Sequence, residues 1–487
     1  MDRCDVSIAR RAPFRPLWLA FASLLAASSL TLAQAPAWQF TKVVAVGDRA
    51  PGGDRFDTLF APGLNNLGEL ALDGIFLVPE FGEGVYVAKG GRLTEVVRTG
   101  HLAPGGGIFG GFGLFGSIGL NDSSELAFNF GLDPAPWLMG KPLQYGAGVY
   151  RRLSGEPVKA VVVPFVTAAP GGGTFQGSGF HASINSLGTA AFAGVVETRE
   201  GSPGPMGRGL GLGQGVYVAN RAGQITAVAG PGDAAPGGDT FDYAEQPWIN
   251  DQGDVAFGGH LHGDQCIDLG QKKFVIFCAV SVYIKDHDGG IRSIAHQGDP
   301  APGGGTYRLA FGPVINNNGD LVFIGDLTKA PDAGDNLAVF LHKDGVTQPI
   351  ARRGDAMPGG GHLLRASFTP RNVDINESGD VVFAAALDTT TGDLVDHGLY
   401  LWSRGRISLI ARTGMKIPGM GTISQLSPPP YYGAPPFPYG YAVINELGQV
   451  AFQALMKDDS SVVLLATPHT TFWVVSALAK LGVPAQE

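Results

Sequence analysis

Charged residues are scarce in this chain of 487 residues, and cysteine is scarcer still. Lys, Arg, Asp and Glu make up 16% of the sequence, against the quarter that is usual in globular proteins. The formal net charge is −9, and no basic run follows the N-terminal segment, which argues against nucleic acid as a partner. Long amphipathic helical patterns are also missing after residue 37, so the sequence does not indicate a helical protein.

The first 37 residues have the pattern of an export signal. Arg10, Arg11 and Arg15 precede the apolar stretch PLWLAFASLLAASSLTLA, and the small residues AQAPA follow it. This order is typical of a signal peptide, and an uncleaved anchor helix is the alternative. We expect cleavage after Ala35 or Ala37, export to the periplasm or the outside of the cell, and no membrane span in the mature chain.

Two cysteines, Cys266 and Cys278, would remain after removal of the signal. In an oxidising compartment a single pair most simply forms a disulfide, which would restrict the loop between them. His260, His262 and Asp264 lie just before this loop and are the alternative, a metal site. Because only a His-x-His pair is visible where at least three converging ligands are needed, we predict no metal and no cofactor.

Glycine and proline, which occur 74 and 34 times, mark an internal repeat. Pro-Gly-Gly triplets begin at Pro51, Pro104, Pro170, Pro236, Pro302 and Pro358, with a degenerate copy at Pro418. A second marker, N-x-x-G-x-x-A-F, starts at Asn65, Asn121, Asn185, Asn250, Asn316, Asn376 and Asn445. The copies recur about every 63 residues, a period far longer than the rung of a β-solenoid.

Each unit holds four short runs rich in Val, Ile, Phe and Tyr, separated by Gly, Asn, Asp and Pro, which predicts four antiparallel strands. A four-stranded sheet cannot bury both faces alone, whereas radial stacking covers each sheet with its neighbours. We therefore predict an all-β, seven-bladed β-propeller over residues 38–470, followed by a tail at 471–487. Seven separate beads would need linkers, and none is visible.

Strands from both termini are expected to close the ring. The stretch FTKVVAVGD before the first Pro-Gly-Gly matches the fourth strand of the other units and has no strands of its own ahead of it. It would complete the last blade. The stretch TTFWVVS near the C-terminus is the alternative for that place.

The repeated N-x-x-G followed by an apolar stretch resembles the secreted bacterial family described as choice-of-anchor tandem repeat NxxGxxxxAF-containing proteins. The similarity covers roughly residues 43–465. The aromatic follows the Asn by seven residues here, as from Asn250 to Phe257, one fewer than in the family pattern. The resemblance implies export, often with a C-terminal sorting anchor, and no established activity. This chain shows no such anchor, and the resemblance implies no catalytic residue.

Both repeat markers have a structural interpretation. Asn and Gly at these spacings are typical of a type I turn, so we interpret the seven asparagines as hairpin formers. Calcium binding is the alternative, but copies such as NSLGTAAF lack the closely spaced oxygen ligands that it needs. The G-D-x-x-P-G-G loops precede strands rather than helices, which indicates a crossover between blades and not a phosphate loop.

Departures from the repeat are the candidates for function. The seventh unit inserts SPPPYYGAPPFPYGYAV, in which Tyr431, Tyr432, Phe437 and Tyr439 could form an aromatic platform for a sugar or a peptide. A flap packed over the ring opening is the alternative interpretation. His101, His296 and His362 flank the Pro-Gly-Gly loops, but no triad order accompanies them, so we expect scattered surface histidines.

The sequence thus predicts an exported, monomeric binding or interaction module with an extracellular glycan or protein as partner. Its site would lie on the face that carries the Pro-Gly-Gly crossovers and the variable loops. The first alternative is a propeller enzyme acting on glycans, for which the available carboxylates are Glu197, Glu200, Asp264 and Asp396. The second alternative is a structural protein of the cell surface.

Overall fold

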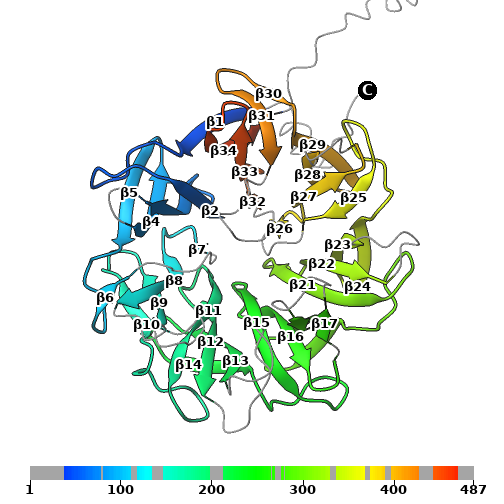
Figure 1. Ribbon diagram of the computed structural model, residues 1–487. Coiled ribbons are helices and arrows are strands. Elements are labelled where there is room, and N and C mark those ends of the chain that lie inside the picture. The colour runs from blue at the N-terminus through cyan, green and yellow to red at the C-terminus, as the bar shows by residue number, and fades with distance from the viewer. Residues whose placement is uncertain are drawn as a thin grey trace, which may run out of the picture. The chain divides into compact units, whose positions relative to one another are not determined.

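The computed structural model describes residues 38–469 apart from 78–80, 111–117, 134–145, 198–211, 265, 269–275, 279, 329–335, 368–372, 390–395 and 427–441. One compact unit spans Trp38–Pro468. It consists of seven antiparallel sheets set radially around an axis, so the predicted seven-bladed β-propeller is confirmed (Figure 1). Within these described ranges there is no helix, and hence none long and apolar enough to cross a membrane.

Each blade is a meander whose first strand lies nearest the axis (Figure 1). Blade 1 contains β2 (Thr58–Leu64), β3 (Leu70–Phe76), β4 (Gly82–Lys89) and β5 (Arg92–Arg98). Blade 2 contains β6 (Ile108–Phe109), β7 (Gly119–Leu120), β8 (Leu126–Asp133), β9 (Ala147–Arg152) and β10 (Lys159–Val162). Blade 3 contains β11 (Phe175–Ile184), β12 (Ala190–Glu197), β13 (Leu212–Ala219) and β14 (Ile225–Ala229).

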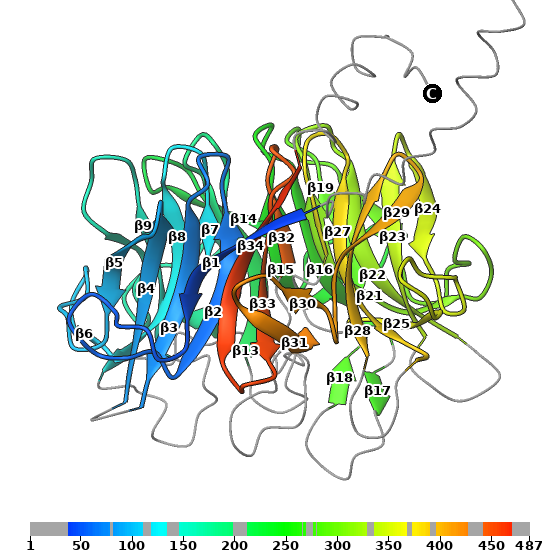
Figure 2. The ribbon, with the colours of Figure 1, turned by 90° about the horizontal axis from the view of Figure 1, so that it is seen from above.

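Blade 4 carries an inserted hairpin (Figure 2). Its sheet contains β15 (Phe241–Ile249), β16 (Val255–Leu261), β19 (Ser281–Lys285) and β20 (Ile291–Ala295), and the hairpin contains β17 (Cys266–Asp268) and β18 (Ile276–Cys278). Blade 5 contains β21 (Tyr307–Ile315), β22 (Leu321–Leu327), β23 (Leu337–Lys343) and β24 (Val346–Ala351). Blade 6 contains β25 (Leu363–Ala366), β26 (Val373–Ile375), β27 (Val381–Leu387), β28 (His397–Ser403) and β29 (Arg406–Arg412).

Blade 7 is built from both ends of the chain. It contains β30 (Lys416–Ile417), β31 (Gly421–Leu426), β32 (Ala442–Ile444), β33 (Val450–Met456) and β34 (Ser461–Pro468). The N-terminal strand β1 (Trp38–Ala45) pairs antiparallel with β34 as the outermost strand, with Trp38 opposite Pro468 and Ala45 opposite Val462. The predicted closure by an N-terminal strand is therefore confirmed.

The N-x-x-G motif forms the hairpin between the first and second strands of a blade. In blade 1, Oδ1 of Asn65 accepts hydrogen bonds from the backbone N–H groups of Leu67 (3.1 Å) and Glu69 (2.9 Å). Gly68 has a φ of 70°, the left-handed conformation that glycine adopts without strain. The predicted turn chemistry is confirmed, and each such hairpin reverses the chain at the axis.

The second strands alternate between two interblade cores. Val255 and Phe257 of β16 belong to the core shared with blade 3, whereas Ala256 belongs to the core shared with blade 5. Successive side chains of a strand point to opposite faces of its sheet, so the two sets enter different cores. Each blade is thus held by side chains of its neighbours rather than by its own sheet alone.

In blades 1, 3, 4 and 5 a glycine in the second strand makes room for the aromatic residue that follows the crossover. A Cβ on Gly194 would lie 2.5 Å from Cε1 of Phe175, which is too close for any real contact. Blade 6 has the smaller Leu363 at the aromatic position and the larger Ala385 at the glycine position. Blade 2 departs from this pattern, since Phe109 and Phe130 occupy the two positions and pack edge to face with their ring centroids 5.0 Å apart.

The Pro-Gly-Gly loops are rigid crossovers from the fourth strand of one blade to the first strand of the next. In the loop before blade 4, Oδ2 of Asp233 accepts a hydrogen bond from the N–H of Gly230 (2.9 Å), and the N–H of Gly232 donates to the carbonyl of Phe241 (2.8 Å). The same bonds recur in other crossovers. They satisfy the loop internally, as the structural interpretation predicts.

Candidate functional site

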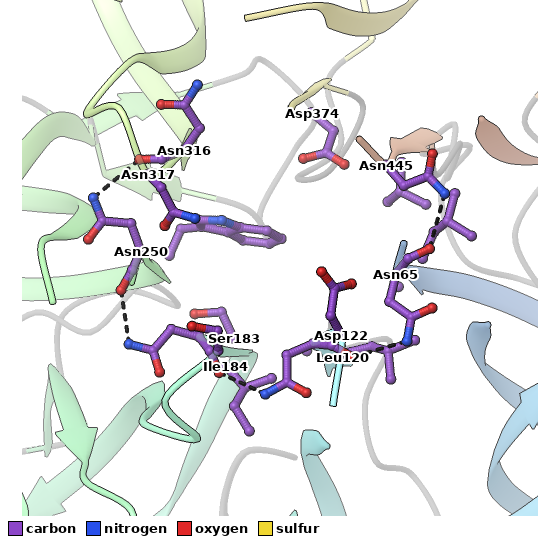
Figure 3. Close-up of a pocket in the computed structure, with 18 of the residues that line it drawn as sticks. Asn65, Leu120, Asp122, Ser183, Ile184, Asn250, Asn316, Asn317, Asp374 and Asn445 are labelled. Carbon is purple, nitrogen blue, oxygen red and sulfur yellow. Dashed lines mark hydrogen bonds between the residues drawn. The ribbon is translucent and has the colours of Figure 1, made fainter. Parts of the chain in front are cut away.

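A cavity of about 190 Å³ lies on the propeller axis and is lined by residues from all seven blades (Figure 3). Its wall consists of the last residues of the innermost strands and the start of each N-x-x-G hairpin, which is the first two residues in six blades and Glu377 alone in blade 6. Because the hairpins follow the first strands and the crossovers precede them, the cavity opens at the end of the propeller opposite the Pro-Gly-Gly loops.

A closed circle of hydrogen bonds surrounds this cavity. The Nδ2 group of each motif asparagine donates to the backbone carbonyl of the motif asparagine in the next blade, over 2.8–3.2 Å. Figure 3 draws part of this circle. The circle runs through Asn65, Asn121, Asn185, Asn250, Asn316, Asn376 and Asn445 and back to Asn65. All seven side chains are buried, so their role is structural. The sequence predicted the turns but not this circle.

The next residue of each hairpin forms an inner circle that faces the cavity. Its members are Asn66, Asp122, Ser186, Asp251, Asn317, Glu377 and Glu446. Six backbone N–H groups of this circle donate to the side-chain oxygen of the neighbouring member, over 2.7–2.8 Å. For example, the N–H of Asn317 donates to Oε2 of Glu377, and the N–H of Glu377 donates to Oε1 of Glu446.

The inner circle carries more negative charge than these hydrogen bonds require. Four members are carboxylates, and a fifth carboxylate, Asp374, also lines the cavity. Asn66 and Asn317 accept the same kind of backbone bond with a neutral amide oxygen. The described lining residues include no Lys, Arg or His. The side-chain amides of Asn66 and Asn317 also donate to Asp122 (2.7 Å) and Asp251 (3.0 Å), so these carboxylates help to hold the circle, although the backbone bonds alone do not require their charge.

Carboxylates on the outer side of the same hairpins are neutralised. The fourth residue after the motif asparagine pairs with a basic side chain near the turn between the third and fourth strands. The pairs are Glu69 with Lys89 (2.8 Å), Glu125 with Arg221 (2.8 Å), Asp254 with His287 (2.9 Å) and Asp320 with Lys343. Basic side chains therefore pair with the outer carboxylates of these hairpins, whereas Asp122, Asp251 and Glu377 face a described lining without Lys, Arg or His.

The electrostatics of the cavity perturb the Glu377 carboxyl group. Burial is the main cause, and the negative charges of Glu446, Asp251 and Asp320 add to it; together they raise the pKa of Glu377 to about 7. The backbone bond from Asn317 opposes this shift. Glu377 consequently exchanges a proton near neutral pH, and a cation in the cavity would favour its ionised form.

Two further side chains of the cavity wall add an aromatic ring and a fifth carboxylate. The half-buried Trp248 lines the cavity from blade 4 and presents an aromatic ring beside the carboxylates. Asp374 is held by the N–H of Ile444, which donates to its Oδ2 over 2.9 Å. An aromatic ring near several carboxylates is a combination that binds ammonium groups through both charge and cation–π attraction.

The aromatic residues predicted as a binding platform, Tyr431, Tyr432, Phe437 and Tyr439, lie outside the described residues, and their role stays a prediction. Cys266 and Cys278 occupy directly opposite positions in the pairing of β17 with β18. Nothing in the described residues tests the disulfide, which also stays a prediction.

The carboxylates considered for an enzyme are not brought together where they are described. Asp264 in blade 4 pairs with His296 (3.0 Å), and Asp396 in blade 6 pairs with Arg412 (2.6 Å). Glu197 ends β12, and Glu200 lies outside the described residues.

The other four histidines considered from the sequence lie beside carboxylates at three separate places. His101 lies 3.6 Å from Glu95, and His362 lies 2.9 Å from Asp388. His260 and His262 both approach Asp242, at 3.5 and 3.2 Å. In the part of the chain that the structure describes, no group of three or more His, Cys, Asp or Glu residues could hold a metal ion.

A family model described as a family of unknown function (DUF7453) matches residues 19–370 and, in a second match, residues 278–467. The chain belongs to this family. A search of curated proteins found no significant match. Membership of DUF7453 therefore assigns the repeat architecture to a family without assigning it an activity.

Solved structures with a similar arrangement are distant. The β-propeller domain of the Trilobed protease from Pyrococcus furiosus has 9% identity and a TM-score of 0.44, covering 84% of this chain and 94% of that one. Pyrococcus horikoshii acylaminoacyl peptidase has 10% identity and a TM-score of 0.42, covering 82% and 49%. Trypanosoma rangeli sialidase has 11% identity and a TM-score of 0.36, covering 77% and 56%. Similarity at this level carries no information on activity.

Proposed function

We propose that this protein is an exported binding module and that its axial cavity takes up an ammonium group. The observation that carries the proposal is that Asp122, Asp251 and Glu377 face the cavity while its described lining has no Lys, Arg or His. Carboxylates that share a cavity repel one another unless a cation or a proton relieves them. Burial chiefly, with the negative charges of Glu446, Asp251 and Asp320 in addition, raises the pKa of Glu377.

An organic cation suits the site better than a bare metal ion. The described carboxylates are not grouped closely enough for three of them to hold a metal ion together. A cavity of about 190 Å³ is also larger than a single ion needs, and it has room for an ammonium group on a short carbon chain. The N–H groups of such a ligand can donate to Glu377 and Glu446 while Trp248 faces its positive charge.

Isothermal titration calorimetry of the mature protein with n-butylammonium tests the proposal. We expect saturable binding that is absent with the uncharged n-butanol. Glu377→Gln and Glu446→Gln should each weaken binding at least about tenfold, which corresponds to about 1.4 kcal/mol. Glu156→Gln removes one negative charge from an exposed pair with Lys159 and serves as the matched control, which should leave binding unchanged.

Three results would contradict the proposal. Equal binding of n-butanol would show that charge does not drive uptake. Unchanged affinity in both cavity variants, or equal losses in the Glu156→Gln control, would show that the cavity carboxylates do not contact the ligand. Binding of calcium chloride in preference to n-butylammonium would show that the site is built for a metal ion.

A further inference from the structure

The hairpins that form the cavity wall carry exposed leucines at its mouth. The third residue of the motif is Leu67 in blade 1, Leu187 in blade 3 and Leu447 in blade 7, with exposed fractions of 53%, 60% and 48%. Each follows directly on an inner-circle residue that lines the cavity. These leucines therefore flank the opening, while the carboxylates lie inside it.

The fold does not require leucine at this position. The backbone N–H of the residue donates to Oδ1 of the motif asparagine, as Leu187 does to Asn185 over 3.1 Å. Polar residues occupy the same place in the other four blades, as Ser123 and Asn318 do, and their N–H groups make the same bond. Apolar side chains at the mouth thus leave the hairpin unchanged and expose apolar surface to water.

Leu447 of blade 7 and Leu67 of blade 1 lie on neighbouring hairpins. The N–H of Glu446 donates to Oδ1 of Asn66 over 2.7 Å, which brings the two hairpins together and sets Leu447 and Leu67 on adjacent turns. Farther from the axis lie the neutralised ion pairs of the outer circle, such as Glu69 with Lys89. From the axis outward, this end of the propeller presents acidic, apolar and charge-balanced zones.

We infer that the ammonium group that enters the cavity belongs to a lysine side chain, presented by a partner polypeptide with apolar residues on either side of the lysine. This inference rests on the proposed function and names its partner. Charge complementarity selects a basic side chain for the centre. A lysine is a compact charge on a long flexible stem, which suits a narrow axial cavity better than the planar fork of arginine. Flanking apolar side chains would cover the leucines.

Three peptide probes test the inference by calorimetry beside n-butylammonium, the analogue of a free lysine side chain. They are acetyl-Gly-Leu-Lys-Leu-Gly-amide, the same peptide with the lysine acetylated, and acetyl-Gly-Ser-Lys-Ser-Gly-amide. We expect the leucine-flanked peptide to bind at least about tenfold more tightly than n-butylammonium, and acetylation to abolish its binding. The serine-flanked peptide should bind no more tightly than the free amine.

A double variant, Leu67→Ser with Leu447→Ser, distinguishes recognition of the flanking leucines of the peptide from binding of the ammonium group. We expect it to weaken the leucine-flanked peptide about tenfold and to leave n-butylammonium unchanged. Leu102→Ser is the matched control, because Leu102 is 84% exposed in a crossover at the opposite end of the propeller. It should change neither affinity.

The outcomes distinguish this inference from the proposed function. Equal affinity of the peptide and n-butylammonium, with no effect of the double variant on either, would mean that a free amine is the ligand; the inference would fail and the proposed function would stand. No binding of any probe would overturn both.

Discussion

Replacing Asn185 by alanine tests whether the asparagine circle stabilises the propeller. Oδ1 of Asn185 accepts hydrogen bonds from the N–H groups of Leu187 (3.1 Å) and Thr189 (2.9 Å), and its Nδ2 donates to the carbonyl of Asn250 (2.9 Å). A hydrogen bond contributes about 1 kcal/mol net, and a buried group left without its partner costs about 1–3 kcal/mol. We expect Asn185→Ala to lower the free energy of unfolding by about 3–5 kcal/mol.

The chain supplies a matched control in the same blade. Asn220 begins another N-x-x-G turn, in which its Oδ1 accepts from the N–H of Gln224 (3.0 Å), but this turn is exposed and lies outside the circle. Water can replace its bonds, so Asn220→Ala should cost only about 1 kcal/mol. Asn185→Asp retains both acceptor bonds and removes the donor to Asn250, but it also places a buried negative charge beside that carbonyl, so its loss is an upper limit for the contribution of the circle.

Urea denaturation followed by circular dichroism measures the three variants. The reasoning predicts that Asn185→Ala loses most, that Asn185→Asp loses about 1–3 kcal/mol, and that Asn220→Ala loses least. If Asn185→Ala and Asn220→Ala are equally destabilised, the bonds between blades add nothing to the turn. If Asn185→Asp matches the wild type, the Nδ2 donor has no energetic role.

Two further predictions concern the cores. Gly194→Ala should lower stability by about 1–3 kcal/mol because its Cβ would overlap Phe175, and Phe175→Leu in addition should restore part of that loss; failure of this rescue in urea denaturation would contradict the steric argument. Burial, with the negative charge of Glu83, raises the pKa of Asp73 well above its ordinary value, so the native state holds a proton that the unfolded chain releases above about pH 4. Stability from this group is lost as pH rises, so Asp73→Asn should stabilise the protein at pH 8 relative to the wild type but not at pH 3; parallel pH profiles would refute it.

Much of the architecture is readable from one unit of the repeat. Asn250 and Gly253 specify a turn by local chemistry, and the alternation from Val255 to Phe257 specifies a strand buried on both sides, because turn preference and the period of two act over a few residues. Repetition of the unit then determines the number of blades. The N-terminal strand at residues 38–45, which has no other strands of its own unit, determines how the ring closes.

The sequence contains one indication of the candidate site. The position after the motif asparagine varies among Asn, Asp, Ser and Glu while its neighbours repeat, and four of the seven copies carry a carboxylate. Because the motif repeats, we interpreted it as structural and predicted a site on the opposite face, in variable loops that lie largely outside the described residues. Variation at that one position of the repeated motif is the feature of the sequence that indicates a site on the axis.

The sequence by itself therefore determined the strands, the hairpins and the count of blades, since each depends on interactions within about 60 residues. Only the tertiary structure decided that those hairpins join in one circle and line one cavity. The asparagine circle joins Asn445 to Asn65 across 380 positions of the chain, and the inner carboxylates gather only once the ring is closed. The raised pKa of Glu377 depends on that closure too, because the burial that mainly causes it, and the charges of Glu446 and Asp251 that add to it, arise only when the fold brings separate blades to one axis.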